Sequence, residues 1–100
     1  MAKIDVTQIL VDLNGEPAKD ETGKPQTLRK ICENALLGAG LPGKLTGEDK
    51  AFRYSLAIRV HDNDEVDLSA EEVVAVKGAI GESYSPLAVG RAWEMLDPKE

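Results

Sequence analysis

The chain has 100 residues, of which 42% are hydrophobic and 30% charged, and its net charge is −6 at pH 7. This length and composition predict one globular domain rather than a disordered segment, and the negative charge disfavours binding to nucleic-acid phosphates. The single cysteine, Cys32, excludes an intramolecular disulfide and a zinc site built from cysteines. No stretch approaches the roughly 18 apolar residues of a membrane span, and the start of the chain lacks a long apolar signal segment. We therefore expect a reduced, cytoplasmic protein with no membrane contact.

Residues 1–26 are predicted to form an extended arm or a β-hairpin. The run at residues 4–13 is rich in β-branched and aliphatic side chains, but it is too short for periodicity to distinguish a strand from a short helix. The pair Asn14-Gly15 follows it and is a strong hairpin signal. Residues 14–26 hold two glycines, two prolines and several charges, which is typical of a loop or a hairpin tip.

A first amphipathic helix is predicted over residues 27–37. Thr27 is suited to the N-cap position, and Gly38 stands where a left-handed C-cap residue is expected. The apolar residues of one face recur every three or four positions. These residues are Leu28, Ile31, Cys32, Ala35 and Leu36.

A loop with four glycines and a proline is predicted at residues 38–47, and a second helix should begin at Thr46 or Gly47. The carboxylates of Glu48 and Asp49 suit the positive end of that helix. An apolar stripe on it is formed by Phe52, Leu56 and Val60, and it is widened by Ala51, Tyr54, Ala57 and Ile58. This breadth predicts a helix that is buried on more than one side.

Residues 61–68 form a polar break, after which Ser69 and Glu72 match a capping box. The third helix is predicted to run from Ala70 to Ile80 and to end at Gly81. Its inner side is marked by Val73, Val74, Val76, Lys77 and Ile80.

The fourth helix is predicted to follow Ser85, an N-cap residue, with Pro86 at its first position and residue 97 at its end. Its apolar stripe consists of Val89, Trp93 and Leu96. The fold class is therefore mainly α, a compact domain of about four helices with an N-terminal extended segment or β-hairpin. Short connections indicate neighbouring helices around one core. We expect the helical part, residues 27–97, to close that core without the arm, in one domain overall.

Two stretches partly match ligand-binding motifs. Residues 38–44, GAGLPGK, match the first part of the phosphate-binding loop motif. However, Leu45 stands where the motif needs Ser or Thr, and the stretch comes after a predicted helix instead of a strand. The acidic run from Asp62 resembles a calcium loop, but its fifth and twelfth positions are Val66 and Val73. A second acidic run, from Asp12, fails the same test. We expect no cofactor and no metal ion.

No group of residues specifies a catalytic reaction, so we expect a protein that is not an enzyme. His61 is the only histidine and lies near a predicted helix C-terminus, where a positive charge is favourable. Without a cysteine nearby or a serine in a nucleophile motif, it forms no catalytic triad. Cys32 lies on an apolar helix face, which favours packing over chemistry.

Aromatic and aliphatic side chains are the better candidates for a binding site. Trp93 is predicted to be the centre of a core that is otherwise poor in aromatic residues, whereas Tyr84 should be partly exposed and available to a partner. The candidate contact residues in the arm are Ile9, Val11 and Leu13. We expect the run from Ile9 to Leu13 to add to the edge of a partner's sheet; the alternative is that it covers one end of the core.

Several short patterns, in chain order, resemble those of a set of small proteins encoded by phages and prophages. They are D-L-x-G-x-P at 12–17, T-L ending in A-L-L at 27–37, R-Y-x-L-A at 53–57, V-D-L-S at 66–69 and S-P-L-x-V-G-x-A-W-x-x-L at 85–96. The resemblance implies a phage or prophage origin, and it supplies no catalytic residues.

The resemblance leads to three hypotheses. The first is a non-catalytic protein-binding protein that acts in virion assembly or as a virion-associated component. The second is a phage-encoded inhibitor or modulator of a host enzyme or defence complex. The third is a small nucleotide-binding protein or enzyme, and the failed motifs disfavour it. The expected partner is a phage or host protein, and self-association into a homo-oligomer stays open.

Overall fold

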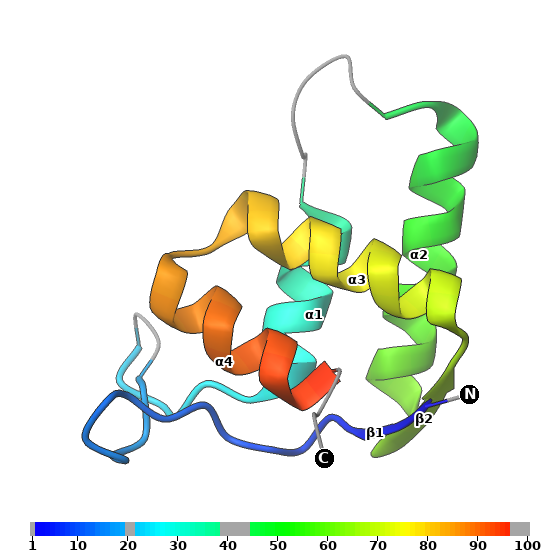
Figure 1. Ribbon diagram of the computed structural model, residues 1–100. Helices are drawn as coiled ribbons and strands as arrows, with labels where there is room; N and C mark the ends of the chain where they lie inside the picture. Colours follow the sequence, from blue (N-terminus) through cyan, green and yellow to red (C-terminus); the bar gives the residue numbers. More distant parts are fainter. Residues whose placement is uncertain (1, 20–21, 39–44, 97–100) are drawn as a thin grey trace.

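The computed structural model describes residues 2–19, 22–38 and 45–96. In chain order the elements are β1 (Ala2–Asp5), α1 (Leu28–Leu37), α2 (Gly47–Asp62), β2 (Glu65–Leu68), α3 (Ala70–Ser83) and α4 (Pro86–Leu96) (Figure 1). The mainly helical fold with an extended N-terminal segment, predicted from the sequence, is confirmed.

Short-range capping interactions fix where three of the helices begin. The Thr27 hydroxyl accepts a hydrogen bond from the Lys30 backbone N–H at the start of α1. Ser69 and Glu72 form the predicted capping box of α3, and Thr46 and Asp49 form a second box at α2. Each box satisfies two backbone donors that a helix N-terminus otherwise leaves unpaired.

The two strands come from distant parts of the chain. β1 pairs antiparallel with β2, with Ile4 opposite Val66, so the partner of β1 lies within the stretch that was predicted to be a polar break. Val66 and Leu68 are buried while Glu65 and Asp67 are exposed, which is the alternation of a strand with one face on the core.

The rest of the arm, over residues 6–19 and 22–26, is irregular and extended and contains no helix. It turns at the predicted Asn14-Gly15 pair, where Gly15 has a φ of 84°, a conformation that glycine adopts at little cost. The Asp12 carboxylate accepts hydrogen bonds from the backbone N–H groups of Asn14 and Glu16, which closes the turn. Isolated bridges then join Val11 to Pro17, Lys19 to Pro25 and Ile9 to Thr27.

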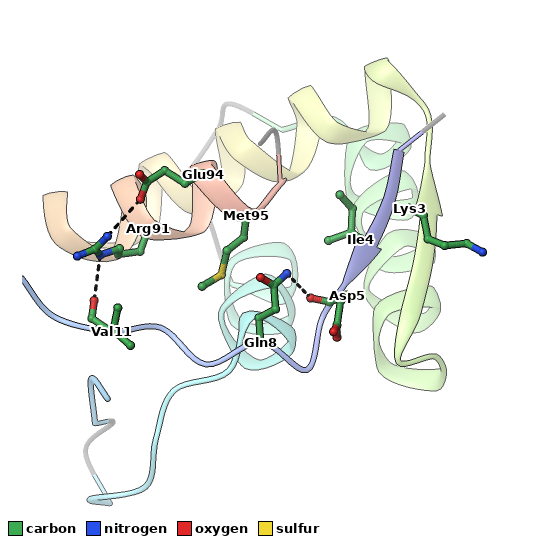
Figure 2. A pocket seen from close by; sticks show the side chains of 8 residues that line it. All are labelled: Lys3, Ile4, Asp5, Gln8, Val11, Arg91, Glu94 and Met95. Carbon is green, nitrogen blue, oxygen red and sulfur yellow. Dashed lines mark hydrogen bonds and ion pairs between the residues drawn. The ribbon is translucent and has the colours of Figure 1, made fainter. Parts of the chain in front are cut away.

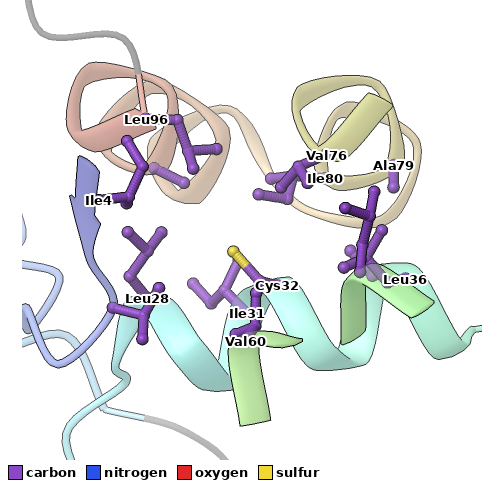
Figure 3. Close-up of a cluster of buried hydrophobic side chains, with 14 of the residues drawn as sticks. Ile4, Leu28, Ile31, Cys32, Leu36, Val60, Val76, Ala79, Ile80 and Leu96 are labelled. Carbon is purple, nitrogen blue, oxygen red and sulfur yellow. The ribbon is translucent and has the colours of Figure 1, made fainter. Parts of the chain in front are cut away.

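The hydrophobic core spans both the arm and the helices. α1 lies at its centre, against α2, α3 and α4 (Figures 1 and 3). From the arm, Ile4, Val6 and Leu10 enter this core, and each is at most 2% exposed. The core is therefore shared, whereas the sequence predicted helices that close it without the arm.

Some predicted helix ends differ from the structure. Gly38 has φ −64° and ψ 160°, which is extended backbone and not the left-handed conformation predicted for it. α3 does not stop at Gly81 but continues to Ser83. A Cβ atom at Gly81 would lie 3.4 Å from Cζ2 of Trp93, so this glycine gives the indole room to lie against α3.

The apolar faces of the helices are narrower than predicted. α2 buries only Leu56, Ala57 and Val60. Its other large apolar side chains, Phe52, Tyr54 and Ile58, are 41–60% exposed, so the prediction that this helix is buried on more than one side is wrong. Val74 on α3 is 69% exposed, although the sequence placed it on the inner side.

Trp93 is not the centre of the core. It is 39% exposed and lies across the outside of α3, where its Nε1–H donates to the Lys77 carbonyl at 3.0 Å. The Lys77 ammonium lies 4.7 Å from the centre of the indole ring, which is within cation–π range. An aliphatic core with the indole on its surface replaces the predicted arrangement.

Candidate partner-binding surface

The arm crosses α4, and the side chain of Arg91 holds it there. The Arg91 Nε donates to the Val11 carbonyl at 3.1 Å, and its Nη2 donates to the Asp12 carbonyl at 3.0 Å. The guanidinium presents its donors in a fixed, planar fork, so these two bonds fix both the distance and the direction of the arm. Glu94, one turn further along α4, lies 3.6 Å from Arg91 Nη1.

Two hollows lie on either side of Arg91. The larger is a groove of about 590 Å³ between β1 and α4 (Figure 2), lined by Lys3, Asp5 and Gln8 on one side and by Glu94 and Met95 on the other. The smaller has a volume of about 300 Å³, and it lies where the arm meets the corner between α3 and α4. We call the two hollows, together with the arm from Ile9 to Leu13, the arm–α4 surface.

The structure brings only two of the predicted contact residues together. Val11 lines both hollows, and Tyr84, which was predicted to be partly exposed and is half-buried, lines the smaller one. Ile9 and Leu13 lie on the same arm, 45% and 85% exposed, but they are not among the residues that line the hollows. Leu87, in the first turn of α4, also lines the smaller hollow and is 37% exposed, although no sequence pattern predicted it as a contact residue.

The backbone between Ile9 and Leu13 is already engaged within the molecule. The Leu10 N–H donates to the Gln26 carbonyl and the Leu10 carbonyl accepts from the Ala18 N–H, both at 2.9 Å. The Asp12 N–H donates to the Glu16 carbonyl at 2.8 Å. The carbonyls of Val11 and Asp12 accept hydrogen bonds from the Arg91 side chain. An added strand would compete with these bonds, so this run offers its side chains rather than a sheet edge.

A second apolar area lies between the end of α1 and α2. Leu37 and Tyr54 are 59% and 60% exposed, and both line a hollow of about 360 Å³ together with Lys50 and Arg53. The stretch that resembles a phosphate-binding loop follows Leu37, and residues 39–44 of it lie outside the described residues.

Cys32 and His61 have structural roles. Cys32 is 1% exposed, and burial raises the pKa of its thiol to about 12, so it is a packing residue as predicted. His61 Nδ1 lies 3.0 Å from Glu33 Oε2 and so joins the end of α2 to α1. Over residues 2–19, 22–38 and 45–96, no group of three or more histidine, cysteine or acidic side chains is placed to hold a metal ion.

The same described residues contain no helix long and apolar enough to cross a membrane. Comparison of the chain with protein-family models, with curated proteins and with solved structures finds no match.

Proposed function

We propose that this chain is a non-catalytic protein-binding domain that contacts its partner through the arm–α4 surface. The observation that carries the proposal is the exposure of apolar side chains on two elements of this surface. Leu13 and Ile9, 85% and 45% exposed, lie on the arm that Arg91 and backbone hydrogen bonds hold in place, and Leu87, 37% exposed, lies on α4. Covering apolar surface contributes about 25 cal/mol per Å² before the entropic cost of association is subtracted, and a surface that is already ordered loses less conformational entropy on binding.

Tyr84 supports the same surface as the centre of a contact. Its ring packs partly against the core and lines the hollow beside Leu87. Aromatic side chains that are held by packing and reach an open hollow are frequent sites of high binding energy. A partner side chain that enters this hollow would contact Tyr84, Leu87 and Val11 together.

The resemblance to small phage proteins supports a partner among virion components, in assembly or in the virion itself. The alternative partner is a host enzyme or defence complex. Affinity capture from lysate of the cells that carry the gene, followed by mass spectrometry, distinguishes the two by the identity of the captured protein.

Variants make this experiment specific to the surface. The double variant Leu13→Asp/Leu87→Asp should lose the captured partner, because two charges replace apolar contacts at the surface. An aspartate at position 87 lies in the first turn of α4, where a negative charge is favourable, so the fold should persist. The control is Ile58→Asp on α2, which replaces an exposed apolar residue outside the arm–α4 surface. Equal capture by both variants would refute the proposed surface.

A further inference from the structure

Within the part of the chain that the structure describes, β1 pairs with another strand on one edge only. The described residues form a two-stranded sheet, and the Val6 N–H donates to the Asp64 carbonyl at 2.9 Å. Hydrogen-bonded pairs alternate along an antiparallel ladder, so Ile4 and Val66 exchange the bonds of the ladder. The peptide N–H and carbonyl of Lys3 therefore point to the opposite edge of β1, away from β2.

That edge opens onto the groove between β1 and α4 (Figure 2). At the C-terminal end of β1, the Gln8 side-chain amide donates to the Asp5 backbone carbonyl at 2.7 Å. This bond occupies the outward-facing carbonyl at that end of the strand. Covering loops, bulges and charged side chains usually protect a sheet edge, because an open edge invites another strand. On β1 the charges of Lys3 and Asp5 restrict which strand can add, since like charges across a strand pair are destabilising. Among the described residues, Gln8 covers one end of this edge, and the groove lies beside the outward-facing peptide of Lys3.

We propose that this groove binds an extended segment of the partner protein, which adds to β1 as a third strand. The inference rests on the proposed protein-binding function and names the recognition mode. The segment exchanges backbone hydrogen bonds with the N–H and carbonyl of Lys3, as in other cases of strand addition. Its inward side chain lies against Met95, whose flexible thioether adapts to apolar groups of different shape.

The charges on β1 predict which charged residues the bound segment carries. Lys3 and Asp5 are both exposed, on the face opposite the buried Ile4. Opposite charges directly across a strand pair are stabilising and like charges are destabilising. The matching segment therefore has an apolar residue facing inward, with an acidic residue next to Lys3 and a basic residue next to Asp5.

A second copy of the chain fits this groove less well than a single segment. Its β1 would bring its own β2 alongside, whereas α4 lines the groove on the side away from β1, with Glu94 and Met95. Because α4 lies where that second strand would have to be, we assign the groove to a single extended segment of another protein.

The test uses a displayed library of random seven-residue peptides, selected on the full chain, with dissociation constants measured by calorimetry. Lys3→Pro removes the outward N–H of β1 and leaves the ladder with β2 intact, because proline is tolerated on an edge strand when its nitrogen faces outward. Lys3→Ala is the matched control, since it removes the charge and keeps the N–H. Selected peptides should bind Lys3→Pro at least about tenfold more weakly than Lys3→Ala.

A second measurement uses the wild-type chain, so it tests the groove even if the Lys3→Pro variant does not fold. Amide hydrogen exchange followed by NMR should show that the Lys3 N–H exchanges about tenfold more slowly with saturating peptide than without it. The amide of Ile4, which already takes part in the ladder, should change less.

Several results would overturn the proposal. They are a selection that yields no peptide, equal affinity of the peptides for Lys3→Pro and Lys3→Ala, and an unchanged exchange rate at Lys3. A dimer of the chain alone that Lys3→Pro abolishes would assign the groove to a second copy, and tighter peptide binding after deletion of residues 97–100 would assign it to the chain's own end. If Lys3→Pro still captures the lysate partner, the groove is wrong while the proposed function stands.

Discussion

Leu10 and Leu13 provide a direct test of how the arm is divided between core and surface. They are the same residue type three positions apart, but Leu10 is 1% exposed and Leu13 is 85% exposed. Replacing a buried leucine by alanine costs about 2–5 kcal/mol, whereas a surface substitution usually changes stability by less than about 0.5 kcal/mol. Since 1 kcal/mol corresponds to about 4–8 °C in a domain of this size, Leu10→Ala should lower Tm by at least about 10 °C and Leu13→Ala by only a few degrees.

Urea unfolding followed by circular dichroism at 222 nm measures both changes as free energies of unfolding. The slope of the free energy against urea should stay the same in the two variants, because neither changes the surface that unfolding exposes by much. Equal losses of stability at the two positions would refute the assignment of Leu10 to the core. A loss at Leu13 that exceeds the loss at Leu10 would reverse it.

Three other perturbations test the fold. Deletion of residues 1–13 should unfold the chain, because burial of the three core side chains of the arm contributes about 1.5–3 kcal/mol each. Their sum approaches the whole free energy of unfolding of a domain, about 5–15 kcal/mol. A truncated chain with a helical spectrum and a cooperative unfolding transition would contradict this expectation. The paired hydrogen bonds from Arg59 lower the pKa of Glu72 from 4.5 to about 2. The ionised carboxylate should therefore add roughly 1–3 kcal/mol to the free energy of unfolding above pH 4.5, and this stabilisation is lost as the pH falls towards 2. Urea unfolding at several pH values should show this loss in the wild type and not in Glu72→Gln. Cys32, buried and with its thiol pKa raised to about 12, should react with a thiol reagent at pH 8 only after denaturation, and rapid reaction of the native protein would place it outside the core.

The helix starts could be predicted from the sequence because their signals are local. Thr27 and Ser69 each act on a backbone N–H three residues away, so the pattern contains the whole interaction. β2 could not be predicted in the same way. The residues of its partner strand β1 lie 60 to 66 positions earlier, and the four residues of β2 are too few to show a clear alternation within a polar stretch.

The burial of the aromatic residues was predicted less well, for a related reason. Periodicity shows that Phe52, Tyr54 and Trp93 lie on helices with apolar neighbours, but it does not show how wide a face the rest of the fold covers. The structure leaves all three between 39% and 60% exposed. Their positions depend on how the helices pack, which the spacing of apolar residues along one helix does not determine.

The candidate site was only partly accessible from the sequence. Val11 and Tyr84 were identified by residue type and lie around one hollow. Arg91, which holds the arm, was not identified, because an arginine on a helix usually indicates a solvent-exposed charge. Its acceptors are backbone carbonyls 79 and 80 residues earlier in the chain, and a backbone carbonyl has no signature in the sequence.

NMR of the ¹⁵N-labelled chain with the captured partner tests whether the arm–α4 surface is the binding site. We expect the amide signals of Leu13, Tyr84 and Leu87 to shift or broaden as partner is added, while those of Tyr54 and Ile58 on α2 stay in place. Shifts confined to α2 and the end of α1, with the arm unchanged, would contradict it.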